Sequence, residues 1–414
     1  MTLSISFSRY FFAALVNLLA SYGLMLFLLT VLAKAEYGQY GIYLSLFSIL
    51  LILFNFGHKE VMFKYASQSA GAVQAGKLRR QGGSDWLNTT WQSFFLWNLM
   101  WLVLVQVLLL VDMTWYWLAL MFLANSWLVT AAACHRGKAN YAFDAFALSA
   151  QRSLWLVFCG LWFWFSDGLD LRAVFVSSLL ASLLCMVWLY LPLLAVLPGP
   201  RSLLTGQDKK HWRLLSNYLL IEVASVFYLK ADVLLLRGFG QGLSTIADYF
   251  FAIQLFEIAV LFIMPVGYFY FNRVSAHVVT GSVNSVGMKS YVAIIVGLVA
   301  LMQLVTFLLA PVIFPLLLPQ YTDSINTVLW VMFALYPVAL NILLSTRLIV
   351  ANKEVVWAKI CLIALLVNLL GNCLLIPRLG IQGAIYIKLL TELLITCLAF
   401  WVLSRDKMER GLQI

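Results

Sequence analysis

The sequence predicts an all-α polytopic membrane protein with about twelve transmembrane helices. Of its 414 residues, 63% are hydrophobic and only 11% are charged, whereas a typical soluble domain has about 25% charged residues. Apolar runs such as Val174–Val196 and Ala384–Leu403 reach the roughly 20 residues that a helix needs to cross a bilayer. Because many such runs follow one another, the membrane assignment does not depend on any single run.

Twelve spans follow from the apolar runs and from the Gly, Pro and charged residues that interrupt them. An "AKA" tripeptide at Ala33–Ala35 imitates a signal-peptide cleavage site. The apolar run before it is longer than the roughly 7–15 residues of a signal peptide, so we interpret it as a retained first helix. We place the spans near residues 10–33, 39–57, 87–111, 115–134, 143–165, 173–196, 214–236, 246–271, 290–310, 326–346, 358–376 and 382–403.

Basic residues are distributed unevenly between alternate loops. Of the 27 Lys and Arg residues, 20 fall on the side that holds both termini, counting Lys359 at the very start of its span, four on the other side and three within spans. The positive-inside rule then predicts that both termini are cytoplasmic, with residues 58–86 as the longest cytoplasmic loop. The net charge of +10 is therefore explained by the orientation of the chain in the membrane. We expect membrane lipids, and not nucleic acid, as partners of the basic residues.

Enzyme signatures are missing from the sequence. The four histidines lack a metal-ligand spacing, no G-x-S-x-G motif occurs, and we interpret the histidines as solvated or facing headgroups. The stretch "GAVQAGKL" has the spacing of a phosphate-binding loop, but Leu78 replaces the Ser or Thr that would hold magnesium. We expect no enzyme activity, cofactor or metal. A membrane-embedded glycan polymerase usually has a sizeable loop, and a non-transporting scaffold would need a large soluble surface or an uncharged bundle interior. The short predicted loops and the charges within the predicted spans argue against both classes.

Eight ionisable residues lie inside the predicted spans. A charge at the bilayer centre costs roughly 2.5–3.5 kcal/mol, so such residues normally face a bundle interior or a water-filled cavity. Lys388 and Glu392 are four residues apart and form either a structural pair or a functional one. On the seventh span, Glu222, Lys230 and Asp232 share one broad polar face, which either lines an aqueous cavity or packs against another polar helix. The eight residues are Arg152, Glu222, Lys230, Asp232, Asp248, Glu257, Lys388 and Glu392.

Six spans in each half, both halves starting inside, predict two related six-helix domains, 1–200 and 201–414. A weak internal repeat agrees with this: "YGQYGIYLSLFSIL" in the first half loosely matches "IADYFFAIQLFEIA" in the second.

Three segments resemble the Wzx-type polysaccharide repeat-unit flippases of the multidrug/oligosaccharidyl-lipid/polysaccharide exporter superfamily. They are the first hairpin "LAKAEYGQYGIYLSLFSILLILFNFGHKEVMFKYAS", the pair "KADVLLLRGFG" and "ADYFFAIQLFEI", in which Phe251 intervenes within the Tyr-x-x-Ala opening, and "VNLLGNCLLIPRLGIQGAIYIKLLTELL". The resemblance implies a MATE-like fold, with two six-helix halves forming a V around a central cavity.

The same resemblance implies a flippase of the bacterial inner membrane. Its substrate would be an undecaprenyl-pyrophosphate-linked oligosaccharide, such as an O-antigen, lipopolysaccharide or exopolysaccharide repeat unit, moved to the periplasmic leaflet by alternating access. We expect Arg152 and Lys230 to contact the pyrophosphate or sugar, because cations would shelter an anionic head group. Glu222, Asp232 and Glu257 are the candidates for proton or sodium coupling, and Lys388, Glu392 and Asp248 are secondary cavity candidates. The alternative is a multidrug/cation antiporter of the same superfamily, which would have an acidic, aromatic-lined cavity.

Overall fold

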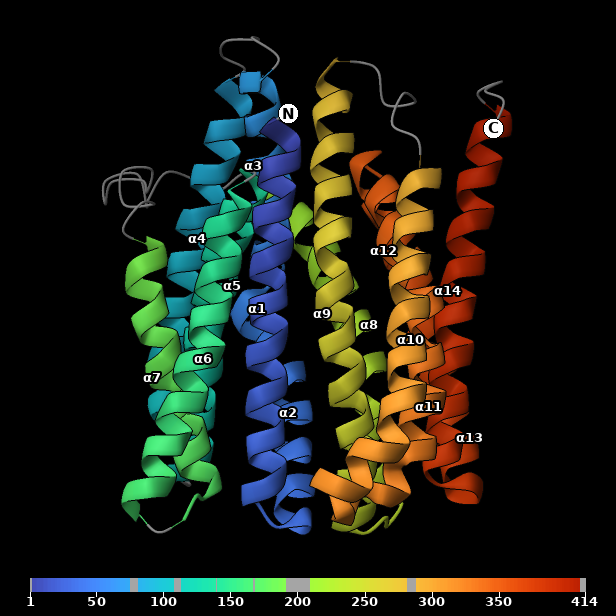
Figure 1. Ribbon diagram of the computed structural model, residues 1–414. Helices are drawn as coiled ribbons and strands as arrows, with labels where there is room; N and C mark the ends of the chain where they lie inside the picture. Colours follow the sequence, from blue (N-terminus) through green and yellow to red (C-terminus); the bar gives the residue numbers. More distant parts are fainter. Residues whose placement is uncertain are drawn as a thin grey trace. The chain divides into compact units, whose positions relative to one another are not determined.

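The computed structural model describes residues 2–74, 81–107, 113–138, 140–166, 168–190, 209–280 and 288–409. These residues are almost entirely helical and contain no β-strand, and the long helices of each compact unit lie alongside one another (Figure 1). The elements are α1 Thr2–Val31, α2 Lys34–Asn55, α3 His58–Gln74, α4 Gln81–Val105, α5 Met113–Gly137, α6 Tyr141–Ser166, α7 Leu171–Tyr190, α8 Lys209–Gly238, α9 Leu243–Thr280, α10 Lys289–Leu317, the 3-10 helix η5 Pro319–Ser324, α11 Ile325–Phe333, α12 Leu335–Val350, α13 Glu354–Leu379 and α14 Ile381–Glu409.

Many of the described helices are long enough to cross a membrane, as expected for a multi-pass membrane protein. Nine segments are long and apolar enough to cross a membrane: α2, α5, α6, α7, α9, α10, the run from η5 to α12, α13 and α14. Three further helices, α1, α4 and α8, are 30, 25 and 30 residues long, which also suffices to span a bilayer. The predicted all-α polytopic fold is therefore confirmed.

Packing divides the chain into two compact units. Unit 1 consists of Met1–Leu32, Phe47–Leu219 and Ser275–Val283, and unit 2 of Ala33–Leu46, Leu220–Val274 and Asn284–Ile414. Helices α2, α8 and α9 each contribute to both units. The predicted domain boundary between residues 200 and 201 lies outside the described residues.

The core of unit 1 includes a helix at residues predicted to form a loop. Residues 58–74 form α3, which packs against α4 and α5. The side chains of Val61, Met62 and Ala66 on α3 are fully buried, and Gly137 at the end of α5 allows the close approach, since a Cβ there would lie 2.6 Å from the Cβ of Ala66. The expectation of a loop over residues 58–86 is wrong for residues 58–74, which form a helix because the polar residues of α3 alternate with an apolar face.

In unit 2, the first half of α2 packs closely against the start of α9. A Cβ at Gly38 would lie 2.1 Å from the carbonyl oxygen of Leu243, so only glycine fits this close backbone approach. At the same end, the Lys34 ammonium lies 2.8 Å from Asp248 Oδ1 and donates to the carbonyl oxygen of Gln320 at 2.8 Å. These contacts fix the beginning of α2 to α9 and η5.

Candidate functional site

Helices α8 and α9 place opposite charges together inside unit 2. The ammonium of Lys230 on α8 forms an ion pair and hydrogen bond with Glu257 Oε1 on α9. The Lys230 side chain is 12% exposed and that of Glu257 is 31% exposed. Both helices run through unit 2 at these positions, and neither charge is left alone in apolar surroundings. The sequence predicted different roles for these two residues, whereas in the structure they are partners.

Asp232, two residues after Lys230, is 1% exposed. Its carboxylate accepts a hydrogen bond from the Tyr249 hydroxyl of α9 and another, at 2.8 Å, from the backbone N–H of Val233. Both ammonium groups of the site, those of Lys230 and Lys388, act electrostatically on this carboxylate. Asp232 is therefore a buried acceptor that neutral donors and cations surround, as a buried carboxylate requires.

Helix α14 contributes the other two charges, Lys388 and Glu392, each 1% exposed. The Lys388 ammonium lies 5.1 Å from the centre of the Phe256 ring, a favourable cation–π distance. Glu392 Oε2 accepts a hydrogen bond from Asn341 Nδ2 of α12 at 2.9 Å, and the Tyr228 hydroxyl lies beside the same carboxyl group. We call Lys230, Asp232, Glu257, Lys388 and Glu392 the charge cluster.

Three predicted site residues lie apart from the charge cluster or in the other unit. Glu222 precedes Asp232 by ten residues on α8, which separates them by about 15 Å along a helix. Asp248 accepts a 2.6 Å hydrogen bond from Ser324 in addition to its ion pair with Lys34, so its contacts hold η5 and α2 in place. Arg152 belongs to unit 1, and its guanidinium lies 5.4 Å from the centre of the Trp155 ring.

Sequence reasoning missed the neutral members of the site. Tyr228, Tyr249 and Asn341 provide the hydroxyl and amide groups that surround Asp232 and Glu392. An Asn inside an apolar run such as that of α12 is a usable signal, because a buried amide needs partners. The two tyrosines give no such signal, since aromatic residues are common throughout this chain.

Unit 1 contains a second buried polar cluster, which corrects the interpretation of the histidines as solvated. His58 and His211 are both fully buried, and their Nε2 atoms lie 2.9 and 3.0 Å from the hydroxyl oxygen of Ser93. His58 Nδ1 lies 2.6 Å from the carbonyl oxygen of Asn55 and therefore donates to it. Burial lowers the pKa of His58 to about 3, so this histidine is neutral, and Ser93 can donate to its Nε2 atom.

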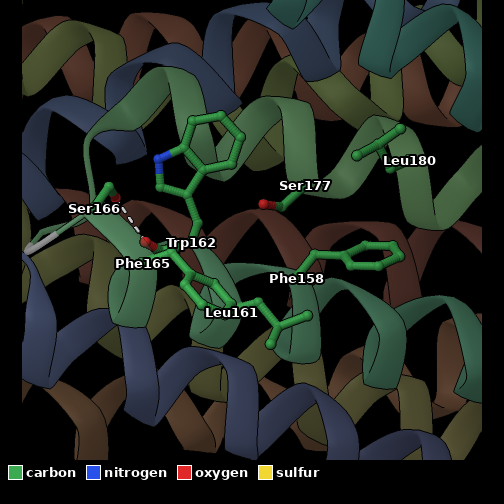
Figure 2. Close-up of a pocket in the computed structure, with 7 residues that line it drawn as sticks. All are labelled: Phe158, Leu161, Trp162, Phe165, Ser166, Ser177 and Leu180. Atoms are coloured by element: carbon green, nitrogen blue, oxygen red, sulfur yellow. Dashed lines mark hydrogen bonds between the residues drawn. The ribbon is translucent and has the colours of Figure 1, made fainter.

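An open apolar pocket lies between α6 and α7 in unit 1, with a volume of about 290 Å³ (Figure 2). The Ser166 hydroxyl at its rim donates to the carbonyl oxygen of Trp162 at 2.6 Å, and the Phe165 side chain is 81% exposed. The lining contains no ionisable side chain, so this pocket is a poor candidate for an ion or an anionic head group. Its residues are Phe158, Leu161, Trp162, Phe165, Ser166, Ser177 and Leu180.

Comparison with known proteins gives similarity in structure but not in sequence. No protein-family model and no curated protein matches the sequence. Among solved structures, an outward-facing multidrug resistance MATE family transporter of the MOP superfamily is similar with a TM-score of 0.72 and 12% identity, covering 99% of this chain and 97% of the other.

Two more examples show the same similarity. The Vibrio cholerae MATE transporter VcmN, in a mutant form, gives a TM-score of 0.69 with 14% identity over 98% of both chains. The eukaryotic MATE transporter AtDTX14 gives a TM-score of 0.68 with 13% identity, covering 97% of this chain and 95% of the other. The chain therefore has the fold of the MATE transporters over nearly its whole length.

Proposed function

We propose that this chain is an ion-coupled membrane transporter that works by alternating access, and that the charge cluster of unit 2 binds the coupling ion. The observation that carries the proposal is the presence of five ionisable side chains together on α8, α9 and α14, three of them 1% exposed. Charges within membrane-spanning helices are costly and commonly mark ion pathways and proton relays. The similar solved structures are transporters, which supports the same assignment.

For the cargo, we infer an organic cation exchanged against the coupling ion. One of the similar structures is a multidrug resistance transporter, which supports this class. The charge cluster contains three carboxylates and two lysines, so it is acidic overall and suits competition between cations. The proposed substrate contact Lys230 is paired with Glu257, which leaves its ammonium less able to bind an anionic head group.

A second candidate cargo is the undecaprenyl-pyrophosphate-linked oligosaccharide. The specific observation in its favour is the resemblance of three segments, above all "LIPRLGIQGAIYIKLL", to polysaccharide repeat-unit flippases. In this second case Arg152 and Lys230 would contact the substrate, Glu222, Asp232 and Glu257 would couple the ion, and the protein would act in a bacterial inner membrane with both termini in the cytoplasm.

Reconstituted vesicles distinguish the two cargoes. The purified chain is placed in liposomes with an imposed pH or Na⁺ gradient, and movement is followed for two probes: ethidium, and a fluorescent sugar linked through pyrophosphate to a short prenyl chain. Ethidium transport that needs the gradient supports the antiporter, and flipping of the prenyl-linked sugar supports the second candidate. Movement of neither probe under either gradient would reject the proposed transport of these cargoes.

A matched pair of glutamates tests the role of the charge cluster. Glu392→Gln keeps the size of the side chain and an acceptor oxygen for Asn341, and we expect it to lose most of the gradient-driven transport. Glu60→Gln is the control, because Glu60 is about one third exposed and pairs with Lys59 at 3.1 Å, and pairs accessible to solvent contribute little. Equal activity of the two variants would contradict the assignment of the coupling site.

A further inference from the structure

Two buried polar atoms of α14 stand out within the charge cluster. Lys388 Nζ and Glu392 Oε1 have no hydrogen-bond partner among the described residues, although both side chains are 1% exposed. The two residues are four apart on one helix face, where Lys and Glu often pair. In the described part of the chain, however, no Lys388 nitrogen comes within 4.0 Å of a Glu392 oxygen. Lys388 and Glu392 therefore do not form a direct salt bridge with each other.

The Lys388 ammonium lies where two carboxylates act on it. Asp232 on α8 and Glu392 on α14 both interact with it electrostatically, and the ring of Phe256 covers it at 5.1 Å. The two carboxylates would also attract a monovalent cation at the position that this ammonium occupies. The ammonium already supplies the positive charge, and a Na⁺ ion entering the same space would be repelled by it.

The charges of the cluster do not balance without one more positive charge. Lys230 and Glu257 neutralise each other, which leaves one ammonium, on Lys388, and two carboxyl groups, on Asp232 and Glu392. A net charge in a buried site is unfavourable. A proton can supply the missing charge by forming an O–H bond on an existing oxygen, and it needs no vacant space.

Hydrogen bonding indicates which oxygen takes the proton. Both oxygens of Asp232 already accept hydrogen bonds, from Tyr249 and from the Val233 N–H, and these donors favour the ionised form. Glu392 Oε2 accepts from Asn341, whereas Oε1 accepts from no described residue. The other titratable groups that act on Glu392 are Tyr228 of α8, Cys361 of α13 and Lys388 on its own helix.

From this arrangement we propose that Lys388 acts as a tethered counter-cation in the place of a metal ion, and that the cluster couples transport to a proton carried on Glu392 rather than to Na⁺. The inference rests on the proposed function, because it names the coupling ion of the same site. In the binding step the Glu392 carboxylate takes one proton from the aqueous phase and becomes a carboxylic acid. In the release step it returns that proton to the opposite side, and no other reactant is needed.

The first test is thermal unfolding of the purified full-length protein in detergent, with NaCl replaced by choline chloride at constant ionic strength. The wild type should unfold at the same temperature in both salts. Lys388→Ala leaves two carboxyl groups around a vacant position, so Na⁺ should raise its unfolding temperature by about 2–4 °C. Lys388→Arg keeps the cation and should stay insensitive, and Lys388→Ala with Glu392→Gln should lose the response.

Two results of this test would overturn the inference. Stabilisation of the wild type by Na⁺ would show that a metal ion binds despite the ammonium. A Lys388→Ala protein that unfolds identically in both salts would show that the ammonium does not occupy a cation site.

The second test needs only the wild type and Glu392→Gln, so it remains decisive if the Lys388 variants do not fold. Dicyclohexylcarbodiimide reacts with protonated carboxyl groups in apolar surroundings, and mass spectrometry locates the adduct. We expect an adduct on Glu392 that forms faster as the pH falls and at equal rates in Na⁺ and choline. Protection by Na⁺, or absence of the adduct from Glu392, would overturn the proposal.

Neither test depends on the cargo. If ethidium and the prenyl-linked sugar both fail to move while the adduct and the salt responses appear as expected, the proposed cargoes are wrong and the proton site stands. If a Na⁺ gradient alone drives transport, the transporter assignment stands and the proton inference is wrong.

Discussion

The ion pair between Lys230 and Glu257 allows a quantitative prediction. Lys230→Met leaves Glu257 without its cation, while Glu257→Gln leaves Lys230 without its counter-charge. Breaking a fully buried pair costs about 3–5 kcal/mol, and an exposed pair contributes about 0.2–1 kcal/mol. Because the two side chains are 12% and 31% exposed, we expect each single variant to lose about 1–3 kcal/mol of unfolding free energy.

The double variant should recover much of that loss, because neither charge is then left without a partner. The measurement is denaturant unfolding in detergent micelles, followed by tryptophan fluorescence, for the wild type, both single variants and the double variant. The double-mutant cycle should give a coupling energy of about 1–2 kcal/mol. Additive losses, with a coupling below about 0.5 kcal/mol, would refute the pairing as a stabilising interaction. Transport measured on the same four proteins separates stability from function: a double variant that folds but does not transport places the pair in the mechanism.

Three further predictions concern other parts of the chain. The pKa of His58 falls from 6.5 to about 3 on burial, so the unfolded state binds more protons than the folded state below pH 6.5. The free energy of unfolding should therefore fall by up to about 1.4 kcal/mol for each unit that the pH is lowered. His58→Gln should flatten this dependence in unfolding measured from pH 7 to 5, and an unchanged slope would contradict the prediction. Gly383→Leu should reduce the yield of monodisperse protein in size-exclusion chromatography, because a Cβ at Gly383 would already lie 2.7 Å from the Leu375 carbonyl; normal yield with lost transport would point to a functional turn instead. Lys34→Met should lower the unfolding free energy by about 1–2 kcal/mol by leaving Asp248 without its cation, and combining it with Asp248→Asn should restore part of the loss; no recovery would reject the pairing.

The sequence predicted the helical membrane architecture because long apolar runs have few alternatives in a bilayer. It also identified all five members of the charge cluster, since ionisable residues within such runs are conspicuous. Their partners were harder to find. Lys230 and Glu257 are 27 residues apart in the sequence, and Glu392 and Asn341 are 51 apart. Such pairs could not be predicted, because local periodicity does not indicate which helices of a bundle are neighbours.

Helix α3 shows a different limit of sequence analysis. Its mean hydropathy is near zero because Lys59, Glu60 and Lys64 accompany its apolar residues, and a search for apolar runs therefore treats it as a loop. The helix forms because Met62 and Ala66 are buried against α4 and α5, a tertiary contact that hydropathy alone does not reveal. The histidines were misplaced for the same reason: the fully buried His58 begins this helix.

The division of α2 between the two units affects how the chain is made. Residues Ala33–Leu46 pack with unit 2, and Lys34 bonds to a carbonyl group 286 residues later in the sequence. At the roughly 5–20 residues per second of protein synthesis, this segment leaves the ribosome on the order of tens of seconds before its partners exist. During that interval its charged start lacks Asp248, and the closely packing glycine face around Gly38 is uncovered. Assembly in the membrane therefore cannot proceed strictly from one end, because the beginning of the second helix can be completed only after η5 has been inserted.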